Sequence, residues 1–295
     1  MKITFLGTSA MVPTADRNHP AILISRNSEN LLLDCGENTQ RQLRKIKFSP
    51  SKLTRLLITH WHGDHILGIP GLIQHLASNN YNKTLEIYGP KNSKLFIKKV
   101  ISSFLLKGKI EYNVHEVSGK FFENQDFILE ATSLKHSAPC LAFSFIEKDK
   151  RNINLDYVKK FGLIKHPLLG DLQKGKDIVY NGKKILAKKA TKIKKGKKVT
   201  YITDTEFTKE CIKAAKNSDI LICESTFSAD MEEKAKEYQH LTSEQAAKIA
   251  KLSNSKKLIL THFSQRYRTP EQLEKEAKKI FKNTTIAEDF MSIKI

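Results

Sequence analysis

The sequence has no apolar run that approaches the length of a membrane span, and its first ten residues, MKITFLGTSA, hold too short an apolar run for a signal peptide. Cysteine is scarce, and Cys35, Cys140, Cys211 and Cys223 form no CxxC motif. That spacing argues against a disulfide framework and against a cysteine metal site. These absences predict a cytoplasmic protein with no membrane partner.

Acidic residues are outnumbered, with 31 Asp and Glu against 51 Lys and Arg and a formal net charge of +20. Such a charge favours a polyanionic partner, most commonly nucleic acid, although a general enrichment in Lys is the alternative. The excess is concentrated, because residues 148–198 hold seventeen basic and four acidic residues. The same segment is poor in apolar residues and interrupted by Gly and Pro, so we expect an inserted arm.

No short-period repeat and no linker between independent domains is present, so we expect residues 1–295 to form one domain that carries the arm. Patterning predicts strands at 2–6, 21–25, 30–34, 55–58, 85–89, 110–117, 127–132, 141–146, 199–203, 219–223, 257–261 and 290–295. It predicts helices at 38–45, 68–78, 94–106, 207–215, 242–253 and 270–281. This mixture indicates a layered α/β protein with helices outside two sheets.

The strongest chemical signal is the segment RLLITHWHGDH at residues 55–65. A short apolar run is followed by His60, His62, Asp64 and His65, and imidazole and carboxylate groups at this density suit Zn²⁺ or a similar cation. In an extended loop, His60 and His62 can point to one side while Asp64 and His65 face a second ion. The alternative is a polar loop with incidental histidines.

Three further candidate ligands each follow a strand-like run. His136 follows FILEATSLK, Asp204 follows VTYIT, and His262 follows KLILT. Side chains at strand ends can converge on one edge of the sheets even when they are distant in sequence. Any one of them alone would more often be structural, but together with the first motif they predict a common site for two metal ions.

These residues resemble the metallo-β-lactamase superfamily and, more narrowly, the ribonuclease Z family of tRNA 3′-processing endonucleases. The resemblance covers nearly the whole chain and includes FLGTSAMVPT near the start, LLLDCGENTQRQL at 31–43 and THFSQRY at 261–267. The basic insertion before Asp204 stands where this family has its tRNA-binding arm. The resemblance implies an αββα sandwich of two mixed sheets flanked by helices, with the arm inserted.

The resemblance also implies two Zn²⁺ ions per subunit, although Mn²⁺ or Fe²⁺ could occupy the same ligands. It assigns seven ligands: His60, His62 and His136 to one ion, Asp64, His65 and His262 to the other, and Asp204 to both. A hydroxide bridging the metals would attack the scissile phosphate, with Asp64 as the proton acceptor. Asp34 would orient the ligands from behind them; the alternative is a simple turn carboxylate.

The leaving ribose oxygen needs a proton, and the family places a His for this purpose in a segment that resembles Gln239 to Thr242. The resemblance therefore implies His240 as the general acid, with Glu224 of ILICESTF holding its tautomer. Cys223 stands where the family usually has His.

The resemblance further implies a precursor tRNA substrate and a homodimer. The residues expected to contact RNA are Arg17, Asn18, Arg266, Lys183, Lys184, Lys188 and Lys189. Ala15 replaces the Lys that is common in the family's N-terminal loop, which is associated with the CCA end. A Lys-rich arm would hold the RNA backbone through its phosphates; the alternative for this segment is a solvated loop.

The function that follows is a zinc-dependent endoribonuclease that removes the 3′ trailer of precursor tRNA and leaves a 3′-hydroxyl on the tRNA. Two alternatives remain at this stage. One is another phosphodiesterase or 3′ exoribonuclease of the same fold. The other is a non-catalytic, metal-stabilised RNA-binding protein, which would have no need of Asp64, Glu224 or His240.

Overall fold

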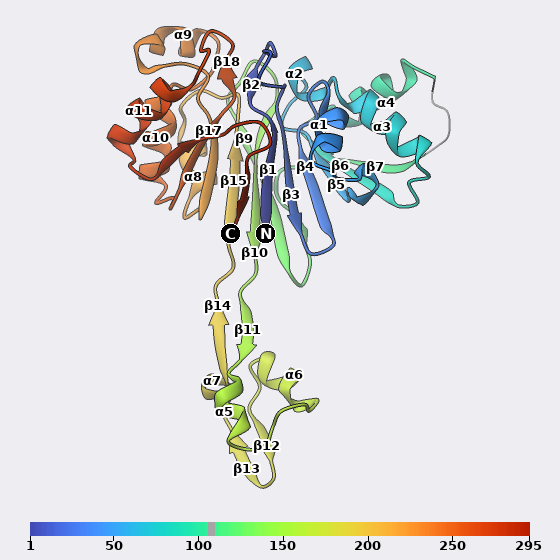
Figure 1. The fold of residues 1–295 in the computed structure, drawn as a ribbon, viewed down its shortest axis with the longest axis vertical. Helices are drawn as coiled ribbons and strands as arrows, with labels where there is room; N and C mark the ends of the chain where they lie inside the picture. Colours follow the sequence, from blue (N-terminus) through green and yellow to red (C-terminus); the bar gives the residue numbers. More distant parts are fainter. Residues whose placement is uncertain (106–109) are drawn as a thin grey trace. The chain divides into compact units, whose positions relative to one another are not determined.

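A computed structural model describes residues 1–105 and 110–295 of the chain (Figure 1). The chain forms two compact units. The larger, here called the body, comprises Met1–Glu123, Leu129–Phe145 and Lys198–Ile295, and the smaller, the arm, comprises Asn124–Ile128 and Ile146–Lys197. None of the helices in the described residues combines the length and the apolar character needed to cross a bilayer.

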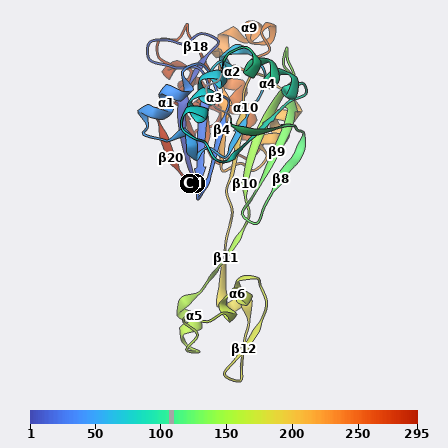
Figure 2. The ribbon, with the colours of Figure 1, turned by 90° about the vertical axis from the view of Figure 1, so that its right-hand side faces the viewer.

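The body contains two seven-stranded sheets, each covered by helices on its outer face. The first sheet has the strand order β20-β1-β3-β4-β5-β6-β7. Its strands are β20 (Ser292–Lys294), β1 (Lys2–Gly7), β3 (Ala21–Arg26), β4 (Glu29–Leu33), β5 (Arg55–Leu57), β6 (Thr84–Gly89) and β7 (Glu111–Glu116). The helices α1 (Thr39–Lys45), α2 (Gly63–Ile66), α3 (Ile69–Ser78) and α4 (Ser93–Ser102) belong to this half, as Figure 2 shows.

The second sheet has the order β19-β17-β16-β15-β10-β9-β8. Its strands are β19 (Thr284–Ile286), β17 (Leu258–Thr261), β16 (Ile220–Glu224), β15 (Lys198–Ile202), β10 (Cys140–Glu147), β9 (Phe127–Leu134) and β8 (Gly119–Glu123). Its helices are α8 (Lys209–Ala215), α9 (Glu232–Glu237), α10 (Ser243–Leu252) and α11 (Glu271–Ile280). The short strands β2 (Ser9–Ala10) and β18 (Phe263–Ser264) pair in parallel.

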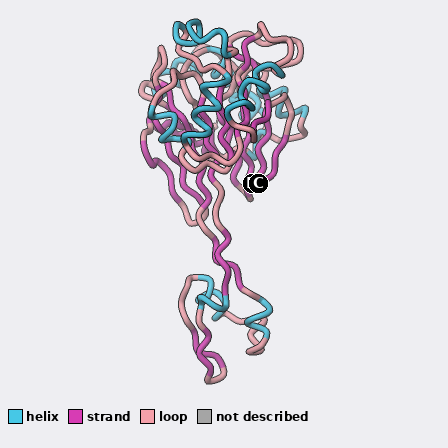
Figure 3. The backbone as a smooth tube through the Cα atoms, turned by 90° about the vertical axis from the view of Figure 1, so that its left-hand side faces the viewer, coloured by secondary structure: helices cyan, strands magenta, loops and turns pink. Residues whose placement is uncertain are grey.

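The central strands are apolar on both faces because each is buried on both sides. In β4, Leu32 packs against the helices, whereas Leu31 and Leu33 face the other sheet. Their partners across the interior include Phe143 and Tyr201. Successive side chains point to opposite faces of a strand, so a run such as Leu31 to Leu33 serves both layers. Figure 3 shows helices of one outer layer in front of the strands.

The arm has a small hydrophobic core of its own, although its composition predicted little apolar packing. Its elements are β11 (Lys150–Ile153), α5 (Leu155–Lys159), α6 (Leu168–Gln173), β12 (Ile178–Tyr180), β13 (Lys183–Ile185), α7 (Ala187–Ala190) and β14 (Thr191–Lys194). Val158, Leu172 and Ile185 are among the residues of its buried cluster. The turn between β12 and β13 uses Asn181 and Gly182, both with positive φ, which is the backbone geometry that suits a tight hairpin.

Most predicted elements of the body are present within a few residues of their predicted ends. The helix predicted for 94–106 ends at Ser102, and residue 106 lies outside the described residues. The sequence analysis missed β8, β19 and α9. The histidine-rich loop is also shorter than predicted, because α2 begins at Gly63 and therefore carries Asp64 and His65 on a helical turn.

Candidate metal centre and active site

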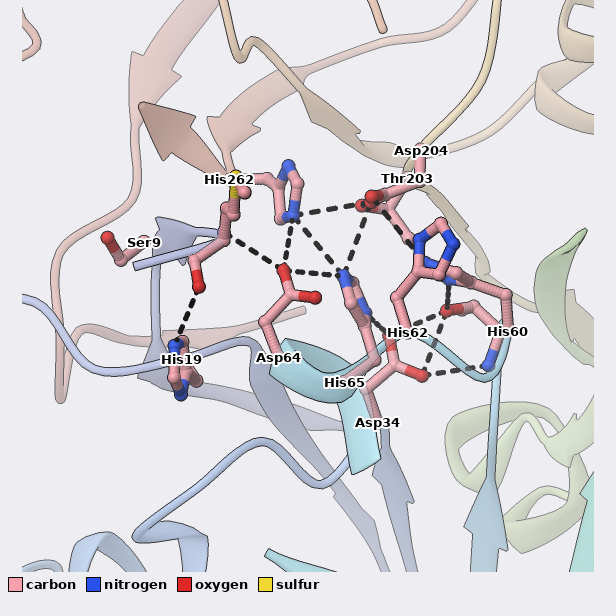
Figure 4. A network of polar contacts seen from close by, with 12 residues as sticks. Ser9, His19, Asp34, His60, His62, Asp64, His65, Thr203, Asp204 and His262 are labelled. Atoms are coloured by element: carbon pink, nitrogen blue, oxygen red, sulfur yellow. Dashed lines mark hydrogen bonds and ion pairs between the residues drawn. The ribbon is translucent and has the colours of Figure 1, made fainter. Parts of the chain in front are cut away.

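The predicted site residues lie where strands of the two sheets end. His60 and His62 follow β5, His136 follows β9, Asp204 follows β15, and His262 follows β17. In the second sheet β15, β16 and β17 are parallel and in register, so their carboxyl ends meet at one edge. The close-up in Figure 4 shows the side chains of His60, His62, Asp204 and His262 gathered in one place.

Three residues at these strand ends have left-handed backbone conformations. The φ angles are 56° at Asp34, 49° at Asp204 and 60° at His262. This region is uncommon for residues other than Gly, and Asp and Asn tolerate it better than most. The chain therefore turns sharply at each of these positions, immediately after the strand. Such backbone strain is typical of functional sites.

The seven predicted metal ligands form two clusters in the structure. The ligand atoms of His60, His62, His136 and Asp204 lie within 4.8 Å of one another, and so do those of Asp64, His65 and His262. These two clusters follow the predicted grouping, and the structure adds a third, in which Asp204 and His262 lie equally close to His240. Their role as ligands stays a prediction.

Asp204 lies between the two clusters and turns one carboxylate oxygen to each. Its Oδ2 atom is 3.6 Å from His60 Nε2 and 3.9 Å from His136 Nε2. Its Oδ1 atom is 3.4 Å from His65 Nε2 and 3.3 Å from His262 Nε2. A carboxylate in this position suits a bridge between two cations.

The imidazole rings are oriented as metal ligands require. The outward nitrogens have protein partners: His60 Nδ1 bonds Thr59 Oγ1, His65 Nδ1 bonds Asp34, His136 Nδ1 bonds the Gln239 carbonyl, and His262 Nδ1 bonds Thr226 Oγ1. A proton on each outward nitrogen leaves a lone pair on the inward one.

Two further observations at the inward nitrogens fit a cation. His60 Nε2 is buried and has no hydrogen-bond partner in the described part of the chain. Burial also lowers the pKa of His60 well below its usual value, with nearby His65 acting in the same direction, so its ring is neutral. Neutral imidazole is the form that binds a metal, and with carboxylate it is a donor set that suits Zn²⁺. The residues present therefore fit the predicted metal ions.

Asp34 lies behind the second cluster, where it is fully buried. Its carboxylate accepts hydrogen bonds from the Thr59 backbone N–H at 2.8 Å, from His65 Nδ1 at 2.8 Å and from the Tyr201 hydroxyl at 3.3 Å. These contacts hold His65 with its Nε2 atom toward Asp204 (Figure 4). The geometry is that of a group that orients a ligand, and differs from an exposed turn carboxylate.

His240 and Glu224 form a pair at the edge of the clusters. His240 Nδ1 donates to Glu224 Oε2 at 3.0 Å, and Glu224 is fully buried. The other oxygen, Oε1, accepts the Thr205 backbone N–H at 2.8 Å. Burial by itself would lower the pKa of His240, but the Glu224 carboxylate raises it to about 9. In this environment His240 carries a proton at neutral pH.

Thr226 links the two parts of the site, and the sequence analysis did not identify it. Its hydroxyl donates to Glu224 Oε2 at 2.5 Å and lies 3.0 Å from His262 Nδ1. Met11 was also missed, and its backbone N–H donates to Asp64 Oδ2 at 3.0 Å. Thr226 could have been found, because it lies two residues after Glu224. A backbone contact such as that of Met11 leaves no signal in the sequence.

The predicted RNA-contacting residues have different surroundings. Arg17 is buried, and its guanidinium donates to the backbone carbonyls of Ser264, Tyr267 and Arg268, so it holds that loop in place. Asn18 donates to the Glu37 carbonyl. A direct contact of either residue with RNA stays a prediction.

Arg266 is exposed, and its guanidinium carbon lies 5.1 Å from the centre of the Phe227 ring. The four predicted arm lysines, Lys183, Lys184, Lys188 and Lys189, are exposed and belong to the other unit. The two buried residues Ile185 and Ala187 stand between them in sequence and pack in the arm's core, which turns the lysines outward.

Comparison with known proteins gives consistent matches over the whole chain. A family model described as Anti-Pycsar protein Apyc1 matches residues 1–286. Ribonuclease Z of Prochlorococcus marinus (strain MIT 9301) is 38% identical, with all of both chains covered. Ribonuclease Z of Methanothermobacter thermautotrophicus is 37% identical over all of this chain and 97% of its own.

Solved structures with a similar fold include a tRNase Z and a more distant protein. Human tRNase Z, short form, superposes with a TM-score of 0.74 at 29% identity and covers 100% of this chain and 99% of its own. The metallo-β-lactamase fold protein YhfI of Bacillus subtilis superposes with a TM-score of 0.72 at 22% identity, covering 99% and 98%. The second likeness bears on the fold alone.

The fold and the His/Asp clusters define a metallo-β-lactamase-fold protein with a metal-binding site of the hydrolase type. The chain belongs to the ribonuclease Z family, and it also belongs to the family that the Apyc1 model describes. The predicted family, the α/β sandwich of two mixed sheets, and the enzyme class of a metal-dependent endoribonuclease are thereby confirmed.

Proposed function

We propose that this protein is a zinc-dependent endoribonuclease that removes the 3′ trailer from precursor tRNA and leaves a 3′-hydroxyl on the tRNA. One observation carries the proposal. A cluster of seven His and Asp side chains that suits two metal ions lies beside the His240–Glu224 pair, which suits proton donation. Metal-binding alone would have no use for a buried carboxylate that holds a protonated imidazole. The names of the full-length relatives supply the substrate class.

The residues assigned to the metal ions are those that the family resemblance implies. His60, His62 and His136 would hold one ion, Asp64, His65 and His262 the other, and Asp204 both. Zn²⁺ fits this set of donors, and Mn²⁺ or Fe²⁺ can use the same groups. When bound, the two cations supply Lewis-acid activation of a water molecule and neutralise charge on the phosphate.

The remaining steps belong to side chains of this chain. Asp64, fixed by the Met11 N–H, accepts the proton of the attacking water. Glu224 holds Nδ1 of His240 and thereby leaves Nε2 free to donate. His240 then protonates the ribose 3′-oxygen as the bond to phosphorus breaks, since an alkoxide is a poor leaving group without a proton.

The arm supplies the binding surface for the RNA backbone in this proposal. Its four exposed lysines, Lys183, Lys184, Lys188 and Lys189, contact phosphates, which contribute affinity and little sequence information. Double-stranded RNA is recognised mostly by shape, so a folded arm with outward lysines suits a tRNA better than it suits a small diester. We also propose that the enzyme is a homodimer, as the family resemblance implies, and that it is located in the cytoplasm. Light scattering after gel filtration measures the oligomeric state.

The test is incubation of the zinc-loaded protein with end-labelled precursor tRNA, with and without a 3′ CCA, followed by mapping of the cut. The expected result is one internal cut that yields a tRNA fragment with a 3′-hydroxyl and an intact trailer. A ladder of mononucleotides would identify an exonuclease instead. Binding of the precursor without any cleavage would identify the non-catalytic alternative.

A further inference from the structure

A cavity of about 230 Å³ lies directly beside His240, in the body. Its walls include Met11, Phe227, Tyr238, His240, Gln265 and Arg266. Sites that enclose a drug-sized molecule have volumes of roughly 300 to 1,000 Å³, so this cavity suits a smaller planar group. None of the described residues that line it is acidic.

The walls of the cavity include flat aromatic and guanidinium groups. The Phe227 ring is buried, and the Arg266 guanidinium lies over it with 5.1 Å between the guanidinium carbon and the ring centre. Arg266 Nε donates to Ser264 Oγ at 3.0 Å, which fixes the plane of the guanidinium. Tyr238 is 51% exposed, and its ring centre lies 6.4 Å from that of Phe227. Aromatic rings and guanidinium planes are the groups on which unpaired RNA bases stack.

Each wall is joined through a short piece of chain to a residue of the proposed chemistry. Phe227 is three residues after Glu224, and Tyr238 is two residues before His240. Gln265 and Arg266 closely follow His262 in sequence. Anything held in the cavity is therefore held at a fixed position relative to the proton donor.

We propose that this cavity binds the nucleobase of the nucleotide on the 5′ side of the cut, the one whose ribose 3′-oxygen is the leaving group. The inference rests on the proposed function, because His240 must reach that oxygen to protonate it. A ribose whose 3′-oxygen lies at His240 carries its base no more than one sugar away, and the cavity is the apolar space that His240 itself lines. The base contacts the Tyr238 ring and the Phe227–Arg266 pair, and the Gln265 amide offers a donor and an acceptor to its edge.

The sharpest test changes the RNA and leaves the enzyme intact. Precursor tRNAs are prepared with an abasic nucleotide either immediately 5′ or immediately 3′ of the cut. Loss of the 5′ base is expected to lower kcat/KM by about fivefold to a hundredfold, the range that stacking of one base on an aromatic side chain contributes. Loss of the 3′ base is expected to have a much smaller effect. Equal effects at the two positions would overturn the proposal.

Protein variants then connect the effect to the cavity. Tyr238→Ala and Phe227→Leu are expected to slow cleavage of intact precursor and to abolish the difference between the two abasic substrates. Tyr238→Phe keeps the ring and is expected to keep that difference. Leu252→Ala, an exposed apolar residue of α10 that is 62% accessible, is the matched control and is expected to behave as wild type. A difference that persists unchanged in Tyr238→Ala would place the base elsewhere and refute the proposal.

The outcomes separate this inference from the proposed function. If the wild-type enzyme does not cut intact precursor tRNA, the function fails and the inference fails with it. If it cuts intact precursor and is indifferent to the missing 5′ base, the inference alone fails. Mapping the cut in each abasic substrate ensures that the rates compare cleavage at the same bond.

Discussion

The carboxylate of Glu224, buried at the end of β16, accepts a hydrogen bond of 3.0 Å from Nδ1 of His240. Because Nδ1 is engaged, the proton that His240 can give away is on Nε2. In the proposed mechanism this proton goes to the leaving group, and metal ions are not needed to explain the contact. The effect of His240 on the cleavage rate should therefore depend on how strongly the leaving group requires a proton.

His240→Ala is expected to lower the rate of precursor tRNA cleavage by about 10²- to 10⁴-fold, the usual contribution of a positioned acid. The same variant is expected to hydrolyse bis(p-nitrophenyl) phosphate at close to the wild-type rate, because nitrophenolate leaves without a proton. Steady-state rates on both substrates measure this. Equal losses on the two substrates would show that His240 acts on the metal site or on folding instead.

Asp34→Asn is expected to weaken metal binding by about 10- to 100-fold, as is typical when the partner of a metal-binding His is changed. The substitution keeps the shape of the side chain, but its amide cannot both accept from Thr59 and fix the proton of His65. Metal content after dialysis against a graded chelator measures the effect. Asp16→Asn, which changes an exposed carboxylate, is the control. Equal metal retention in the two variants would contradict the role given to Asp34.

Replacing Lys183, Lys184, Lys188 and Lys189 by Ala is expected to weaken tRNA binding and to lower the slope of log Kd against log salt by about 3, since each phosphate contact contributes roughly 0.7 to 0.9. Hydrolysis of bis(p-nitrophenyl) phosphate should not change. The matched control removes four exposed lysines of the body, Lys248, Lys251, Lys275 and Lys279. The same change in slope in both variants would show that the arm lysines act only through the net charge of the protein.

Asp289 should make the stability of the protein depend on pH. Its carboxylate accepts from Thr8 Oγ1 and from the Asn18 N–H, yet burial raises its pKa from 3.8 to about 6. The folded state therefore binds more protons than the unfolded state between these values, and the contribution of Asp289 to stability falls as pH rises through that window.

Asp289→Asn removes this loss, because an amide can still accept from Asn18 while donating to Thr8. Relative to wild type, the variant is expected to be more stable at pH 8 than at pH 4 by about 1 to 2 kcal/mol, a value reduced for partial exposure. Urea unfolding of metal-saturated protein at the two pH values measures this difference. A stability difference between variant and wild type that does not change with pH would contradict the raised pKa of Asp289.

The sequence could suggest which residues gather at the candidate site because several of the predicted ligands lie just after an apolar run. Strands such as β16 and β17 are apolar on both faces, so their ends are visible in the sequence, and parallel pairing brings those ends together. The resemblance assigned Asp204 to both ions, but strand patterning alone could not show that its two oxygens turn to different clusters. The orientation of the Asp204 carboxylate depends on a left-handed backbone conformation at Asp204. No glycine marks that position, so the sequence gives no sign of the conformation.

The arm was harder to predict for a different reason. Its buried residues, such as Val158, Leu172 and Ile185, are widely spaced and separated by lysines, so no period of a helix or strand is evident. The core forms only when the short elements α5, α6, β12, β13 and α7 pack together. The Asn181–Gly182 pair was an available hairpin signal that the sequence analysis did not use. The structural role of Arg17 was also hidden from the sequence, because its hydrogen bonds go to backbone carbonyls of a segment about 250 residues away.

The register of the parallel strands has a consequence for how this enzyme can be altered. Glu224 pairs with Thr261, the residue before His262, so the partner of the proposed proton donor and a predicted metal ligand are set at the same level of adjacent strands. Insertion or deletion of one residue in β16 would turn the Glu224 side chain to the other face of the sheet. Insertions and deletions should therefore be tolerated in the loops that precede these strands, whereas within the strands they should abolish turnover. Recombination with homologues should accordingly succeed only when the crossover lies in one of those loops.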